Sequence, residues 1–259
     1  MNFTSTELIS WVTLYSWPFV RIAAFVSVAP IFGTHTVPMR VRLMIAIALA
    51  MIAAPVLPKM KFIDPLSYEG IVVTFHQVLI GLAIGFTMTL IFSVLITGGQ
   101  MVAQLMGLGF ASMMDPQNGV SVPVVGQFYT IMATLIFLVL NGHLVLIDLL
   151  VSSFQTLPVG EFGLSIDKIW QFVLWSKVIF VGALMIALPA VTALLLVNVA
   201  FGVMTRTSPQ LNIFAVGFPI TILLGFILIL ITLPYFIPKL QQLFEHSFNF
   251  IRNTLIAKG

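Results

Sequence analysis

The sequence predicts an all-α membrane protein: about six long hydrophobic helices arranged as hairpins, some of them kinked, with an amphipathic helix at the C-terminal end. Composition is the first observation, because 60% of the 259 residues are hydrophobic and only 7% are charged. Such a composition excludes an ordinary soluble domain. The second is the distribution of charge, which falls mostly between or beyond long apolar runs. The third is the absence of cysteine, which excludes disulfides, thiolate metal sites and cysteine nucleophiles.

Each apolar run is expected to be helical, and the six runs cover residues 8–32, 39–58, 70–112, 122–152, 169–201 and 211–237. A spanning helix needs about 20 residues, so the first two runs fit a bilayer simply. A continuous helix over 70–112 would extend about 60 Å at about 1.5 Å per residue. Because the hydrocarbon core is about 30 Å thick, this helix must kink, tilt steeply or leave the bilayer.

Glycines in the third run suggest how that helix packs and bends. Gly81 and Gly85 form a small-xxx-small face that allows a neighbouring helix to approach closely. Gly98 and Gly99 are the predicted flexing point. The third and fourth runs are therefore expected to form an extended helical hairpin.

Prolines and a polar turn organise the C-terminal half. Pro189 lies in the middle of the fifth run, where the loss of a backbone hydrogen bond should kink the helix. A turn from Arg206 to Pro209 leads into the sixth run, which Pro234 and Pro238 are expected to close.

The tail from residue 239 to 258 has a different pattern, with apolar side chains at helical spacing and polar ones between them. This periodicity predicts an amphipathic helix, suited to a lipid headgroup layer or to a partner protein. The apolar positions are Leu240, Leu243, Phe244, Phe248, Ile251, Leu255 and Ile256, with Ser247 on the same face.

Charged residues do not settle the orientation in the membrane, because lysine and arginine occur in both sets of loops. Arg21 interrupts the first run. It is expected either to pair with a neighbouring subunit or a lipid headgroup, or to extend its charged end to the interface. The net charge of +3 is too small to indicate a nucleic-acid partner.

The tip of the predicted hairpin is apolar, yet it can continue neither helix, because four glycines, two prolines and a DPQNG turn lie within residues 107–127. Lipid cannot satisfy an irregular backbone, so this segment must be buried in protein or line a cavity. That makes it the predicted gate, plug or pore constriction. Its candidate residues are Gly107, Gly109, Phe110, Met113, Met114, Asp115, Pro116 and Gly119.

Two functions are open for Asp115, the one charge in this segment. A proton-sensing group is one interpretation, because an ionisable residue near a pore is often functional. A type I turn, with the aspartate bonded to its own backbone, is favoured and is compatible with a plug.

No motif of catalysis is present. The sequence lacks GxSxG, HExxH and P-loop patterns, and its four histidines have no metal-ligand spacing. We therefore expect neither an enzyme nor a cofactor or metal site.

Several segments together resemble the FliR family of flagellar export-apparatus proteins, and the match extends over nearly the whole chain. They are Gly109-Phe-Ala-Ser-Met-Met-Asp115-Pro116, Pro123-Val-Val-Gly-Gln-Phe128, Leu140-Asn-Gly142-His143, Pro189-Ala-Val-Thr-Ala-Leu-Leu-Leu-Val-Asn198, Arg206-Thr-Ser-Pro209-Gln210-Leu-Asn212 and Gly217-Phe-Pro219. An early Arg21 followed by Pro30-Ile-Phe-Gly33, Pro38 and Arg40 adds to the likeness. Injectisome proteins share the architecture.

The resemblance implies a single export-gate domain over residues 1–259. Within it, residues 1–155 would be a FliP-like helical unit with plug loop 107–123, and residues 165–259 a FliQ-like hairpin with its amphipathic tail.

The same resemblance implies a core subunit that forms a channel with FliP and FliQ for unfolded flagellar proteins, with FlhB associated and FlhA nearby. It places the chain, in contact with lipid, in the bacterial inner membrane within the flagellar basal body. Partner ATPases and the ion gradient would supply the energy. The alternatives are an injectisome subunit, a self-contained transporter or channel, and a non-conducting scaffold.

Overall fold

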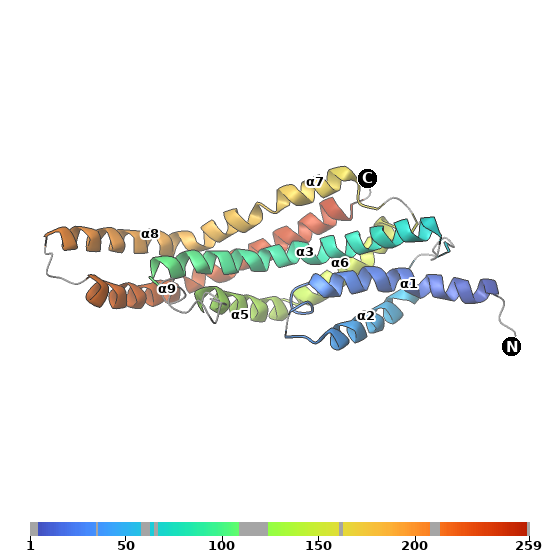
Figure 1. Cartoon of the computed structure of the whole chain (residues 1–259), viewed down its shortest axis with the longest axis horizontal. Helices are drawn as coiled ribbons and strands as arrows, with labels where there is room; N and C mark the ends of the chain where they lie inside the picture. The colour runs from blue at the N-terminus through green and yellow to red at the C-terminus, as the bar shows by residue number, and fades with distance from the viewer. Residues whose placement is uncertain are drawn as a thin grey trace. The chain divides into compact units, whose positions relative to one another are not determined.

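The computed structural model describes residues 5–34, 36–57, 63–64, 67–108, 124–160, 163–207 and 213–257, with side chains described from residue 14 and, after the gap at 208–212, from residue 217. All regular elements in these ranges are helical, which confirms the predicted all-α class (Figure 1). They are α1 (Ser5–Val28), α2 (Met39–Ala53), the short 3-10 helix η1 (Ala54–Val56), α3 (Tyr68–Leu105), α5 (Val124–Val139), α6 (Gly142–Thr156), α7 (Ile166–Trp175), α8 (Val178–Thr207), α9 (Ile213–Phe250) and the π-helix η2 (Ile251–Leu255).

Four helical stretches of the described chain are long and apolar enough to cross a bilayer: Met39–Val56, Tyr68–Leu105, Ile166–Thr207 and Gly217–Leu255. The helices α5 and α6 provide a fifth if the broken pair is one span. They are separate helices because Asn141, between them, has a left-handed backbone with φ of 55°. A right-handed helix cannot continue through such a residue.

The predicted end of the sixth run at Pro234 and Pro238 is wrong. The helix α9 continues through both prolines to Phe250, and η2 extends it. Each proline removes one helical hydrogen bond, but packing against neighbouring helices can hold the backbone in place. For the same reason α8 continues through Pro189. The helix α3 also runs through Gly98 and Gly99 without a break in its secondary structure.

The chain divides into two compact units, each built from segments that are distant in the sequence. Unit 1 contains Met1–Leu90, Leu138–Ser176 and Phe244–Gly259, and unit 2 contains Ile91–Phe137 and Lys177–Leu243. This division follows tertiary contacts. The FliP-like and FliQ-like parts, which rest on the resemblance, stay a prediction.

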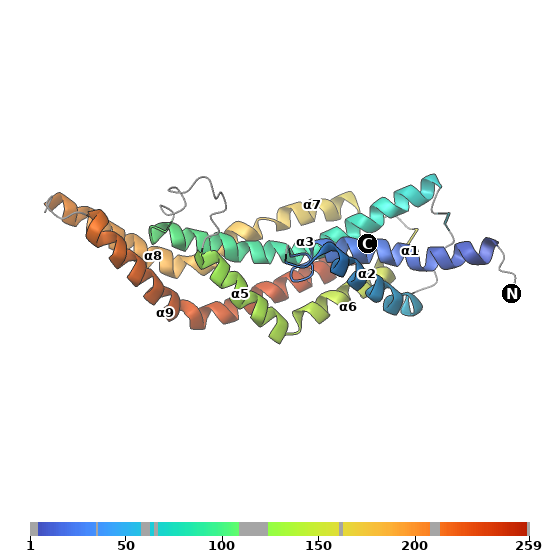
Figure 2. The same ribbon diagram turned by 60° about the horizontal axis from the view of Figure 1, so that its bottom comes forward.

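In unit 1, α1 and the first half of α3 lie side by side at very short range (Figure 2). A Cβ atom added at Gly85 would lie 3.0 Å from the carbonyl oxygen of Phe25, and one at Gly81 would meet the carbonyl oxygen of Arg21 at 2.2 Å. Only glycine permits this backbone contact at position 81.

The apolar face of the amphipathic tail is covered by its own chain, whereas the sequence analysis expected a headgroup layer or a partner protein to cover it. Its apolar face is buried, with Phe244, Ile251 and Leu255 at most 2% exposed. The Phe250 ring stacks on Trp175 of α7, with centroids 4.4 Å apart. Burial of this face inside unit 1 satisfies the hydrophobic periodicity, so the pattern by itself does not indicate a membrane surface.

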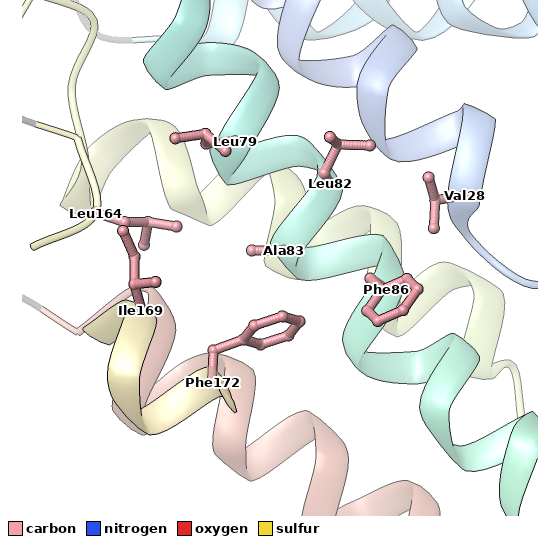
Figure 3. Close-up of a pocket in the computed structure, with 8 residues that line it drawn as sticks. All are labelled: Val28, Leu79, Leu82, Ala83, Phe86, Leu164, Ile169 and Phe172. Atoms are coloured by element: carbon pink, nitrogen blue, oxygen red, sulfur yellow. The ribbon is translucent and has the colours of Figure 1, made fainter. Parts of the chain in front are cut away.

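An apolar cavity of about 350 Å³ lies in unit 1 beside α3 (Figure 3). Leu79, Leu82, Ala83 and Phe86 of α3 line it together with Phe172 of α7. Its remaining lining residues are Val28, Leu164 and Ile169.

Candidate functional site

The candidate site is the mount of the predicted plug loop, where α3 ends in unit 2. The backbone closes there with two hydrogen bonds, from Gly107 N–H to Gln104 O and from Leu108 N–H to Ala103 O, both 3.0 Å. Gly107 has φ of 81°, a left-handed conformation that glycine adopts without strain. These features form a Schellman motif, which gives the helix a defined end.

Side chains of α8 and α9 hold the last turn of α3 from outside. Asn198 Nδ2 donates to the carbonyl oxygen of Leu105 at 3.2 Å. Thr221 Oγ1 lies 3.4 Å from the carbonyl oxygen of Met106, with which it hydrogen bonds. Both carbonyls belong to the helix end, where α-helical partners run out. The two side chains therefore satisfy acceptors that lipid would leave unpaired.

Tight packing adds to this mount. The Met106 side chain is fully buried and lies over Gly225 of α9, where an added Cβ would meet Met106 Cγ at 2.4 Å. The ring of Phe218 covers Gly107 in the same way, at 2.6 Å from the Cβ position. We refer to Asn198, Phe218, Thr221 and Gly225 together as the α3 clamp.

The start of α5, where the chain re-enters the described helices, is held against α3 as well. An added Cβ at Gly99 would lie 2.4 Å from Gly126 Cα, so the two backbones touch. On another side of α3, Gly98 lies against Ala183 of α8, with 3.1 Å from the Cβ position to the carbonyl oxygen. The described residues on either side of segment 109–123 thus belong to one closely packed set of helices.

The structure describes only one of the predicted gate residues. Gly107 is placed by the structure as the left-handed residue of the helix end. The others, Gly109, Phe110, Met113, Met114, Asp115, Pro116 and Gly119, lie outside the described residues. Of the predicted turn after α8, Arg206 is exposed in the last helical turn and Pro209 lies outside the described residues.

Arg21 is neither a subunit contact nor a snorkelling residue in this structure, because its side chain is fully buried inside unit 1. Its Nε donates to Gln77 Oε1 at 2.7 Å, Nη1 to Ser153 Oγ at 2.9 Å and Nη2 to the carbonyl oxygen of Leu157 at 2.8 Å. The guanidinium also lies 3.9 Å from the centroid of the Phe154 ring.

This network joins three helices through one cation. The planar guanidinium fork directs its donors to α3, to α6 and to the carbonyl that follows α6. A buried charge is costly unless it is well hydrogen bonded, and the ring face of Phe154 adds a favourable cation–π contact. Arg21 is therefore a packing residue that fixes the register of α1.

Sequence reasoning missed most partners in both places. Gln77, Ser153 and Thr221 were given no role, and Asn198 entered only as part of a motif. A polar side chain within an apolar run is itself the signal that could have identified them, because hydrocarbon does not tolerate unpaired polar groups. Among the described residues, no three His, Asp or Glu side chains gather to hold a metal ion.

Comparison with known proteins adds the family. The model of bacterial export proteins, family 1, matches residues 12–247. The chain belongs to this family. Its curated relatives include the flagellar biosynthetic protein FliR of Escherichia coli (strain K12), 38% identical over 255 residues that cover 98% of this chain and 97% of that protein.

More distant relatives agree with this membership. FliR of Pectobacterium carotovorum subsp. carotovorum is 36% identical over 98% of this chain and 97% of its own. FliR of Bacillus subtilis (strain 168) is 31% identical over 93% of this chain and 94% of its own. With its long apolar helices, the chain is a membrane protein of the FliR family of flagellar biosynthetic export proteins.

Proposed function

We propose that this chain is a core subunit of the flagellar type III export gate. In this proposal it forms, with FliP and FliQ, the channel through which unfolded flagellar proteins pass. The relatives that it resembles over nearly their full length carry flagellar names, which favours a flagellar over an injectisome subunit. FlhB and FlhA would lie nearby, and the complex would reside in the inner membrane within the basal body. The chain supplies a passage, and no catalysis.

The proposed closing element is the segment 107–123, and the observation that supports it is the α3 clamp. A loop that closes a channel must be fixed at its base and flexible at its tip. The Schellman end at Gly107 and the hydrogen bonds of Asn198 and Thr221 provide the mount. The glycines, methionines and phenylalanine beyond it suit the tip, because they exclude water without directional bonds that a passing chain would have to break.

Deletion of residues 110–116 tests this function. The deletion leaves Gly107 and the clamp intact, so we expect normal assembly with FliP and FliQ but an ion-leaky membrane. Membrane conductance is measured in cells together with co-purification of the three proteins. Normal assembly with unchanged conductance would exclude the plug role and favour a non-conducting scaffold. A chain that purifies alone as a stable transporter would exclude the export-gate subunit.

A further inference from the structure

A second cavity, of about 210 Å³, lies within unit 2 and differs from the first by its polar lining. Three helices contribute to it: α5, α8 at Pro189 and the second half of α9. Its polar side chains are Tyr129, Thr232, Tyr235 and Lys239. The apolar part of the lining consists of Met185, Ile186, Pro189, Ile229, Leu233 and Phe236.

Tyr129 is the informative residue of this cavity. It is only 3% exposed, and its ring stacks on Phe236 with centroids 4.9 Å apart. Within the described part of the chain its hydroxyl forms no hydrogen bond, and it is not among the polar atoms that are fully enclosed without a partner, so it is open to the cavity. A phenol hydroxyl that faces a cavity normally finds a hydrogen-bond partner there, in water or in a ligand. A ligand in the cavity would supply one.

Lys239 indicates that the ligand is negatively charged. The residue lines the same cavity, and its Nζ donates one hydrogen bond within the described chain, to Gln242 Oε1 at 3.3 Å. An ammonium has three donors, so two remain after this contact. A lysine and a tyrosine that line one small cavity favour an anion with several acceptor oxygens.

The surroundings indicate that the anion is attached to an apolar chain. On α8, Leu184 and Leu188 lie beside the lining residues and are 50% and 48% exposed, and Ile231 of α9 is 62% exposed. Tyrosine and lysine at the end of an apolar run are typical of the interface at which lipid headgroups lie. A protein carboxylate would fit the charge but would not need this exposed apolar surface.

We propose that the cavity binds the phosphate group of a membrane phospholipid. Lys239 and Tyr129 hydrogen bond to the phosphate oxygens, while an acyl chain covers Leu184, Leu188 and Ile231. The site is separate from the α3 clamp, and its existence does not depend on whether the chain forms a gate.

The test uses the full-length protein in its native complex, purified in mild detergent and stripped of lipid. The thermal midpoint is measured during titration with dioleoylphosphatidylglycerol, with dioleoylglycerol as the probe that lacks phosphate, and with inorganic phosphate alone. We expect phosphatidylglycerol to raise the midpoint and the other two probes to leave it unchanged. Lys239→Gln should weaken the apparent affinity about tenfold, and Tyr129→Phe should weaken it by a smaller factor.

Lys177→Gln is the matched control, because Lys177 is exposed in the turn before α8 and lies outside the cavity. It should titrate like the wild type. Tyr129→Phe keeps the ring stack, so it remains informative if Lys239→Gln does not fold. Equal titration of the wild type and both cavity variants would overturn the proposal. So would an equal response to inorganic phosphate, or loss of a co-purifying protein from Lys239→Gln without any lipid response.

Discussion

The side-chain amide of Asn198 donates a hydrogen bond to the main-chain carbonyl oxygen of Leu105, 3.2 Å away, and so joins α8 to the last turn of α3. The two residues are 93 positions apart in the sequence. Their contact fixes the point from which the predicted plug loop leaves the helices. It also gives the polar side chain of Asn198, within the apolar helix α8, a partner at a helix end, where carbonyl groups run out of helical donors.

Loss of this hydrogen bond should loosen the mount. Asn198→Leu leaves the Leu105 carbonyl without a donor, so we expect a loss of stability of about 1 kcal/mol. If the proposed function holds, Asn198→Leu should also increase ion leakage through the membrane. Thermal unfolding of the purified complex and membrane conductance are the measurements. Thr192→Val is the control, because this exposed threonine bonds only within α8. Equal effects of the two variants would contradict a clamp at Asn198.

The contact between α3 and α5 should not tolerate a methyl group. Gly99→Ala places a Cβ 2.4 Å from the backbone of Gly126, and backbone cannot move aside as a flexible side chain can. We expect a loss of about 1 to 3 kcal/mol or failure to assemble. Gly202→Ala is the control, because no described atom beyond its own stretch of helix lies within 4 Å of its Cβ position. That variant should be neutral or more stable, since alanine favours helix. The measurement is the amount of folded complex recovered after heating for each variant. A Gly99→Ala variant as stable as the wild type would contradict the close contact between α3 and α5.

The buried guanidinium should not be replaceable by another cation. Arg21→Lys keeps the charge but cannot reach Gln77, Ser153 and the Leu157 carbonyl together. It should cost about 2 kcal/mol or more, whereas Ser153→Ala should cost about 1 kcal/mol. Arg206→Lys, at an exposed position, should be neutral. Thermal midpoints of the three variants test this. A neutral Arg21→Lys would mean that only the charge matters at this position.

The apolar cavity beside α3 should accept a larger side chain. Ala83→Leu adds apolar volume to a space of about 350 Å³ (Figure 3), so we expect a gain of about 0.5 to 1 kcal/mol. Ala200→Leu, at an exposed position on α8, should stay within about 0.5 kcal/mol of the wild type. The thermal midpoint is again the measurement. A destabilised Ala83→Leu would show that the cavity walls cannot accommodate the added methyl groups.

Local pattern was sufficient for the class of protein and for most helices. The apolar runs at 39–58 and 70–112 correspond to α2 with η1 and to α3, because a run of about 20 or more apolar residues needs no long-range contact to be recognised. The combined segments, from Arg21 to Pro219, were sufficient to indicate the family that the comparisons then showed.

Sequence pattern failed to predict features that depend on packing against other helices. The prolines at 234 and 238 resembled a helix end, yet α9 continues through both. The tail resembled a surface helix, yet Phe244 and Ile251 are buried inside unit 1. Helical periodicity states that one face is apolar, but not what covers that face.

By itself, then, the sequence determined that this chain is a helical membrane protein of an export family, with a bend-prone apolar segment after its third run. The tertiary structure alone decided that Arg21 bonds to Ser153, 132 positions away, and that Asn198 and Thr221 hold the end of α3. The physical reason is the range of the interactions. Apolar composition acts residue by residue, whereas a hydrogen-bond partner for a buried polar group exists only once distant helices have met.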